Sequence, residues 1–232
     1  MCRDVKMTMH HKMPLSVQGR KTLPVSVFKI AFLLFGSGAC ALVYQVVWLR
    51  ELRLVFGAST AAAAAVLAIF MGGLGLGGIF LGRRADFHQR PLLFYANLVL
   101  LLSGSALLTP FLMVVVRQVY IWMGGSQALG PELATLVRLI LSALILGVPT
   151  FLMGGTLPAA ARAVEIEADV GRRRLAMLYG LNTLGAVIGV VFATFFMIEI
   201  FGTRNSLFLA CLLNGLIAVA ARVIARSEPL KE

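Results

Sequence analysis

The feature that most constrains this chain is a succession of apolar stretches, separated by short segments that carry most of its charge. Of the 232 residues, 59% are hydrophobic and 13% are charged, whereas about a quarter of the residues in a soluble domain are charged. A helix of ~20 apolar residues is long enough to cross a hydrocarbon core of ~30 Å. The sequence therefore predicts an all-α, multi-pass membrane protein, with no room for a soluble catalytic domain of ~100 residues beside the spans.

The apolar stretches predict six membrane helices. They cover residues 30–49, 61–81, 92–116, 133–161, 175–200 and 206–221. The last is barely long enough to span a bilayer. Residues 1–29 contain several Lys and Arg residues and two prolines, which predict a flexible basic tail, and residues 222–232 form a short C-terminal tail. We therefore expect one six-helix transmembrane domain, residues 30–221, between two tails.

The basic residues gather at one set of helix ends. Most of the 21 Lys and Arg residues lie in the N-terminal tail, in segments 83–90 and 162–174, and at the C-terminal end. The others are Arg50, Arg53, Arg117, Arg138 and Arg204. Cytoplasmic loops carry such an excess in membrane proteins, so both termini are predicted to be cytoplasmic. The same bias accounts for the net charge of +11 without a nucleic-acid partner, and the lipid bilayer is the expected surrounding.

Residues that would support catalysis or metal binding are scarce. Cys2, Cys40 and Cys211 have no paired spacing, and no His/Cys cluster, nucleophile elbow or phosphate-binding loop is present. We therefore expect no cofactor, no metal and no catalytic residue in this chain, so it is not expected to be an enzyme on its own.

Pairs of small residues predict close helix packing. Without side chains at these positions two helix backbones can approach closely, which favours association in lipid. We expect packing within one bundle, with a subunit interface as the alternative. The candidate packing residues are Gly73, Gly77, Gly78, Gly82, Gly185 and Gly189.

A polar segment lies at the end of the first stretch. Gln45, Arg50 and Glu51 form either a polar site near the outer surface or an interfacial anchor with a local ion pair. In the second interpretation Trp48 and Arg50 lie at the outer interface of an uncleaved first span.

Few other polar residues fall at membrane depth, and the candidates for a polar site among them are Asn97, Arg138, Asn182 and Glu199. A charge facing hydrocarbon is costly, so Arg138 and Glu199 are candidates for a binding site. Both lie toward the outer side and could pair with each other. The alternative is that both extend to the interface without forming a site.

One short motif occurs twice. Met71-Gly72-Gly73 in the second stretch returns as Met153-Gly154-Gly155 in the fourth. Transporter folds are commonly built from repeated three-helix units, although chance matches of Gly and Met are frequent in membrane segments. A duplication and a coincidence both remain open at this point.

Several blocks, in order, carry a family resemblance. They read SGACALVYQVVWLR (37–50), FMGGLGLG (70–77), PTFLMGGTLP (149–158) and LYGLNTLGA (178–186). These blocks resemble the membrane region of bacterial spermidine synthase-like proteins over about residues 30–221. The loop from Gly82 to Arg90 also partly resembles the Gly-x-x-x-Asp…Arg signature of major facilitator transporters, without its last glycine. The resemblance implies a bundle like half of a major facilitator transporter, in a bacterial cytoplasmic membrane.

In the spermidine synthase-like family, the membrane helices precede an aminopropyltransferase-like domain that this sequence does not contain. None of that domain's catalytic residues can therefore be carried over. The resemblance implies a membrane anchor or substrate-handling partner for a separate cytoplasmic aminopropyltransferase-like protein of polyamine metabolism. The alternatives are a polyamine-like solute transporter, acting as a homodimer of six-helix halves, and a truncated product without activity of its own. Among acids at membrane depth, only Glu199 and Glu51 could meet a polycation.

Overall fold

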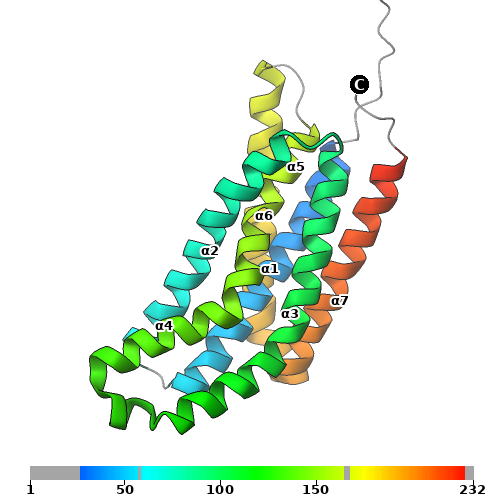
Figure 1. The fold of residues 1–232 in the computed structure, drawn as a ribbon. Helices are drawn as coiled ribbons and strands as arrows, with labels where there is room; N and C mark the ends of the chain where they lie inside the picture. Colours follow the sequence, from blue (N-terminus) through cyan, green and yellow to red (C-terminus); the bar gives the residue numbers. More distant parts are fainter. Residues whose placement is uncertain (1–26, 57–58, 165–167, 228–232) are drawn as a thin grey trace, which may run out of the picture.

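The computed structural model describes residues 27–56, 59–164 and 168–227, and every regular element in these ranges is helical (Figure 1). The elements are α1 (Val27–Phe56), α2 (Thr60–Asp86), α3 (Pro91–Trp122), α4 (Gly125–Gly154), α5 (Thr156–Val164), α6 (Ala168–Phe192), the π-helical turn η1 (Ala193–Met197) and α7 (Ile198–Arg226). The all-α prediction is confirmed for these residues.

The surface of the bundle is apolar along its length. Large hydrophobic side chains such as Phe111, Leu144, Phe195 and Leu212 are exposed. Five helical segments are long and apolar enough to cross a membrane: 27–56, 63–86, 91–122, 127–164 and 173–226. A soluble protein does not expose so much contiguous apolar surface, whereas a lipid-facing bundle does. The chain therefore has the character of an integral membrane protein.

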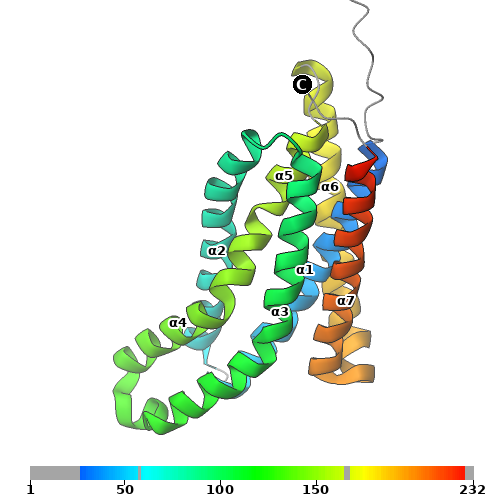
Figure 2. The ribbon, with the colours of Figure 1, turned by 45° about the vertical axis from the view of Figure 1, so that its right-hand side comes forward.

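Two predicted helices, 175–200 and 206–221, fall within the last of these five segments. Gly202 interrupts the helical backbone between them, with φ 75° and ψ 171°. Only glycine adopts such a conformation readily. The chain turns near this point, at the lower end of the bundle, and α7 then runs upward to Arg226 (Figures 1 and 2).

The helices differ from the predicted ranges at several boundaries. α1 begins at Val27, inside the predicted tail, and α7 extends through Arg226, inside the other predicted tail. α2 continues to Asp86, so Arg83 and Arg84 are helical rather than in a loop. The predicted loop 162–174 shortens in the same way, because α5 reaches Val164 and α6 begins at Ala168. The predicted ranges ended where the apolar runs end, whereas the helices continue beyond these runs into charged residues.

The predicted helix 133–161 is divided into two. α4 starts before it, bends at Gly130 (φ 70°) and ends at Gly154, and α5 starts at Thr156. The N–H of Gly155 bonds to the carbonyl oxygen of Leu152 at 3.2 Å, which closes a tight turn between the helices. The structure thus has two helices, α4 and α5, in place of the one predicted.

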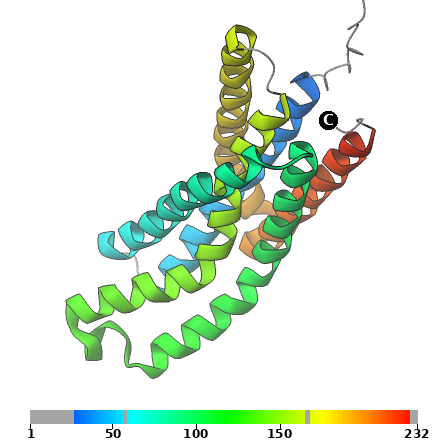
Figure 3. The ribbon, with the colours of Figure 1, turned by 45° about the horizontal axis from the view of Figure 1, so that its top comes forward.

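The helices pack as a set of extensive pairs. α1 packs mainly on α6 and α7, α2 on α4, and α3 on α7 and α4. Figures 1 and 3 both show α2 beside α4, and α1 at the centre of the bundle. At Gly77 a Cβ would overlap the backbone of Phe151, and at Gly185 it would overlap that of Phe35. Both pairs therefore depend on glycine for their close approach.

Of the other candidate packing glycines, three lie at these two crossings, and Gly82 lies where α2 meets α5. Gly73 faces Thr150, Gly78 faces Gly154, Gly82 faces Pro158 and Gly189 faces Ala39. The duplicated Met-Gly-Gly motif thus has its two copies on the two helices, α2 and α4, that cross each other. Each copy of the motif supplies small residues to the contact between α2 and α4. This shared packing requirement explains why the two segments are similar without requiring a gene duplication.

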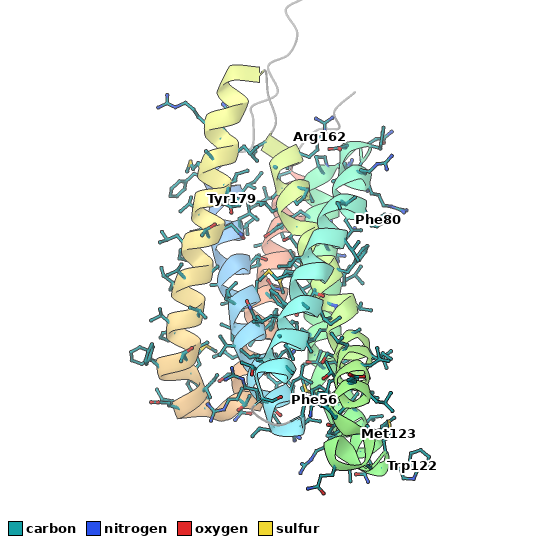
Figure 4. All side chains as sticks on the ribbon, turned by 90° about the vertical axis from the view of Figure 1, so that its left-hand side faces the viewer. Phe56, Phe80, Trp122, Met123, Arg162 and Tyr179 are labelled. Atoms are coloured by element: carbon teal, nitrogen blue, oxygen red, sulfur yellow. The ribbon has the colours of Figure 1, made fainter. Side chains whose placement is uncertain are left out.

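The interior contains two apolar clusters at different heights. The lower cluster joins α1, α3, α4 and α7 through residues such as Trp48, Leu102, Ile145 and Leu207. The upper cluster joins α1, α3, α5 and α7 through residues such as Leu34 and Val99. Figure 4 shows Arg162 at the upper end of the bundle and Trp122 at the lower end.

Candidate functional site

A cavity of ≈ 310 Å³ lies between the lower parts of α1, α3 and α7. Its polar lining comes from Trp48, Glu51, Thr109, Arg117 and Arg204, and the rest of the wall is mostly apolar. A concave, mostly apolar site with a few convergent polar groups is the usual form of a small-molecule site.

A bend in α3 accompanies the cavity. Pro110 lies inside α3 and lines the cavity. Proline bends a helix because its ring pushes against the preceding turn and it has no N–H to donate. The upper half of α3 runs beside α7, whereas the lower half leans away from α7 toward α4 (Figure 2). The cavity lies where α3 leaves α7.

Thr109 compensates for the missing proline donor. The carbonyl of Ala106 lies four residues before Pro110 and would accept its N–H in a regular helix. Instead, the Thr109 hydroxyl donates to the carbonyl oxygen of Ala106 at 2.7 Å. The indole N–H of Trp48 in turn donates to Thr109 Oγ1 at 2.9 Å. This chain of hydrogen bonds fixes Trp48 as one wall of the cavity.

Three charged side chains from three helices line the cavity. Glu51 is half-buried on α1, and Arg117 and Arg204 are exposed on α3 and α7. Glu51 forms no ion pair within 4 Å with any arginine among the described residues. The site therefore offers one carboxylate and two guanidinium groups that do not neutralise one another by direct contact.

Above the cavity, buried polar groups join α1 and α3 to α7. The Tyr44 hydroxyl donates to the carbonyl oxygen of Ala210 at 3.1 Å, and the Ser103 hydroxyl donates to that of Cys211 at 2.6 Å. Asn214 is fully buried beside Tyr44, and neither of its amide atoms has a hydrogen-bond partner within the described parts of the chain. These contacts hold the three helices that form the cavity.

The polar segment at the end of α1 is only partly assembled into a site. Glu51 lines the cavity, whereas Arg50 is exposed and Gln45 is half-buried, and neither lines it. The expectation that Trp48 anchors the span at the outer interface is wrong, since Trp48 is 1% exposed and stacks on Tyr44 at 5.5 Å. Trp48 lies on the face of α1 that points into the bundle. The sequence alone does not distinguish a tryptophan packed in this way from one at the membrane–water interface.

The two asparagines lie elsewhere. Asn97 Oδ1 accepts a hydrogen bond from Arg222 Nη2 at 2.7 Å, joining α3 to α7 toward the upper end. Asn182 lies on α6 against Gly38 of α1. The structure thus uses both side chains at helix contacts, away from the cavity.

The pairing of Arg138 with Glu199, one of the two alternatives that the sequence left open, does not occur. Arg138 is 8% exposed on α4, and its Nε donates to the Tyr120 hydroxyl at 3.3 Å. Glu199 is exposed on α7. α4 and α7 do not contact each other in the described residues. Helix packing therefore places the two residues on helices that are not neighbours in the described part of the chain.

Several residues of the cavity were not predicted from the sequence. Arg117 and Arg204 were noted only as charges of the outer side, and Thr109 and Pro110 were not singled out. The spacing of Thr109, Met113 and Arg117 places them on one face of a helix, and all three line the cavity. That face was a detectable signal, but nothing in the sequence indicates that it meets Glu51.

Metal binding has no candidate here: no group of three or more His, Cys, Asp or Glu side chains in the described ranges could hold an ion. No family model, curated protein or solved structure matches the chain. The resemblance to spermidine synthase-like proteins thus gains no support from these comparisons and stays a prediction.

Proposed function

We propose that this chain is a membrane-embedded protein that binds a small solute in the cavity between α1, α3 and α7. The observation that carries the proposal is the convergence of Glu51, Arg117 and Arg204 on one cavity from three helices. Charges near the membrane are costly and usually mark a substrate or ion pathway. Such a site fits the substrate-handling role implied by the family resemblance.

We propose six membrane crossings within this architecture. A straight helix over residues 173–226 would be about 80 Å long at 1.5 Å per residue, far longer than a ~30 Å hydrocarbon core. The non-helical backbone at Gly202 supports a reversal there, so that α6 and α7 cross separately.

The contacts between helices support an arrangement of two three-helix units. In this arrangement α1 corresponds to α4, α2 to α6, and α3 to α7. The contact between α1 and α6 then corresponds to the contact between α4 and α2. The contact between α1 and α7 corresponds to that between α4 and α3. All of these pairs are extensive, and α3–α7 maps onto itself. Inverted three-helix repeats of this kind occur in each half of major facilitator transporters, which is the half-bundle expected from the resemblance.

We propose a cytoplasmic location for the upper end, in a bacterial inner membrane. Arg83, Arg84, Arg162 and Arg226 lie near the helix ends on that side, and basic residues are retained in the cytoplasm. The cavity would then open near the outer surface.

A separate aminopropyltransferase-like partner and a homodimer remain predictions. Recovery of such an enzyme in a pull-down from mild detergent would support the first, and dimers in native mass spectrometry would support the second. Polyamine binding is also a prediction, but two arginines beside Glu51 make this cavity a poor site for a polycation.

Calorimetric titration of the protein in nanodiscs tests the solute-binding proposal. Spermidine, putrescine, amino acids and small carboxylates are the probes. Binding to the cavity should be altered by Glu51→Gln and unaffected by Glu199→Gln, a matched change on the exposed face of α7. Equal responses of the two variants, or no binding of any probe at millimolar concentration, would contradict the proposal.

A further inference from the structure

We infer that the cavity selects a zwitterion, a ligand with an ammonium group and a carboxylate or phosphate a few bonds apart. The inference rests on the proposed solute-binding function and specifies its ligand. A free amino-acid-like solute and a phosphatidylethanolamine headgroup share this chemistry.

The charges of the cavity distinguish a zwitterion from the other classes. A purely cationic ligand could pair with Glu51 but would be repelled by Arg117 and Arg204. A purely anionic ligand could pair with a guanidinium group but would leave the Glu51 carboxylate without a counter-ion. A zwitterion places its anion toward the arginines and its ammonium toward Glu51, so that both ends form charge-assisted hydrogen bonds.

The positions of the charged groups fit a ligand whose ammonium group meets Glu51 and whose anionic group meets the two arginines. Glu51 extends from α1, whereas the two arginines extend from α3 and α7. None of the three is hydrogen-bonded to another described side chain. Guanidinium groups present several donors in a planar fork that matches a carboxylate or phosphate. The apolar wall, including Val47, Met113 and Leu207, leaves room for an aliphatic group.

The fluorescence of Trp48 can report ligand binding in the cavity. Trp48 lines it, and Trp122, at the far end of α3, is the other of the two tryptophans. In a Trp122→Phe protein the fluorescence therefore comes from Trp48 alone. Trp122 is 86% exposed, so its replacement should not disturb the packing.

The test measures Trp48 emission in dodecyl maltoside, a detergent without phosphate or ammonium groups. The soluble probes are leucine, leucinamide and N-acetylleucine, which share one side chain and differ in charge, together with spermidine. The lipid probes are dihexanoyl phosphatidylethanolamine and dihexanoyl phosphatidic acid. If the ligand is a free solute, we expect leucine to bind at least about tenfold more tightly than leucinamide or N-acetylleucine. If it is a lipid headgroup, we expect phosphatidylethanolamine to bind more tightly than phosphatidic acid by the same factor.

Three variants of cavity residues and one control variant test which charged side chain binds which end of the ligand. Glu51→Gln should weaken binding of the zwitterion about tenfold while leaving N-acetylleucine or phosphatidic acid unweakened. Arg117→Gln and Arg204→Gln should weaken zwitterion and anion alike. Arg53→Gln, an exposed arginine of α1 that does not line the cavity, should have no effect.

The outcomes separate the two proposals. Tighter binding of leucine supports a free zwitterionic solute, and tighter binding of phosphatidylethanolamine alone supports a lipid headgroup. Equal or tighter binding of leucinamide, spermidine, N-acetylleucine or phosphatidic acid overturns the zwitterion inference but leaves a ligand-binding cavity. No change of Trp48 emission with any probe overturns both.

Discussion

The indole N–H of Trp48 in α1 and the hydroxyl of Thr109 in α3 form a 2.9 Å hydrogen bond across the helix interface. The same hydroxyl donates to the Ala106 carbonyl, which Pro110 leaves without its usual donor. The Thr109 side chain thus supplies the hydrogen bond that Pro110 cannot donate, and it also holds Trp48 in the wall of the cavity. The bend and the cavity wall should therefore respond together to mutation.

Replacing Thr109 by valine should destabilise the protein by about 1 to 2 kcal/mol. The change keeps the size of the side chain but leaves both the Trp48 N–H and the Ala106 carbonyl without a partner. Thr109→Ser, which retains the hydroxyl, should cost less. Thermal unfolding in detergent, followed by circular dichroism, provides the measurement.

A second change tests the role of Pro110. In a Pro110→Ala protein the alanine N–H can donate to the Ala106 carbonyl, so Thr109→Val should be less costly in that background. The difference between the two backgrounds measures the coupling of residues 109 and 110. Equal costs in both backgrounds would show that Thr109 does not compensate for the proline.

Gly77→Ala should destabilise the α2–α4 pair by about 1 to 3 kcal/mol, because the new methyl group would overlap the backbone of Phe151. Gly72 lies on the same helix with nothing within 4 Å of a Cβ. Gly72→Ala should therefore leave stability unchanged or slightly increased. The unfolding temperatures of the two variants in the same detergent give the comparison, and equal losses would contradict the observed helix crossing.

Arg138 and Glu199 should behave independently. Since α4 and α7 do not touch, the effects of Arg138→Gln and Glu199→Gln on the free energy of unfolding should add within about 0.5 kcal/mol. Arg138 and Tyr120 are hydrogen-bonded, so Arg138→Met and Tyr120→Phe should instead show a coupling of about 0.5 to 2 kcal/mol. A coupling between Arg138 and Glu199 that exceeds the coupling to Tyr120 would contradict this separation and favour an ion pair between them.

The six-crossing topology can be checked with a membrane-impermeant thiol reagent on single-cysteine proteins. Trp122→Cys and Asn205→Cys should be labelled from outside intact cells. Phe87→Cys and Ser227→Cys should be labelled only after permeabilisation. If instead Asn205→Cys is protected and Ser227→Cys is labelled from outside, the last segment crosses the membrane once.

The sequence predicted the helical class and the position of most apolar segments, because ~20-residue apolar runs have few alternatives in a membrane. It misjudged helix ends, since charged residues such as Arg83 and Arg84 continue a helix beyond its apolar run. It also treated 133–161 as one helix, whereas the structure has a turn at Gly155 between α4 and α5, which nothing in the apolar pattern marks.

The candidate site was predictable only in part. Glu51 was identified as a charge at membrane depth, and it lines the cavity. Its neighbours there, Arg117 and Arg204, come from helices far away in the sequence. Periodicity shows which residues share one helix face, but not which helix that face meets, so neither the cavity nor the separation of Arg138 from Glu199 could be derived from one sequence.

The extensive pairing of α1 with α6 and α7 also constrains how the protein is made. Ribosomes add roughly 5 to 20 residues per second, so α1 waits on the order of ten seconds before these partners emerge. During that interval the Tyr44 hydroxyl lacks its acceptor, the carbonyl oxygen of Ala210 in α7. We therefore expect α1 to need other contacts for this hydroxyl, with lipid or with the insertion machinery, until α7 has been made.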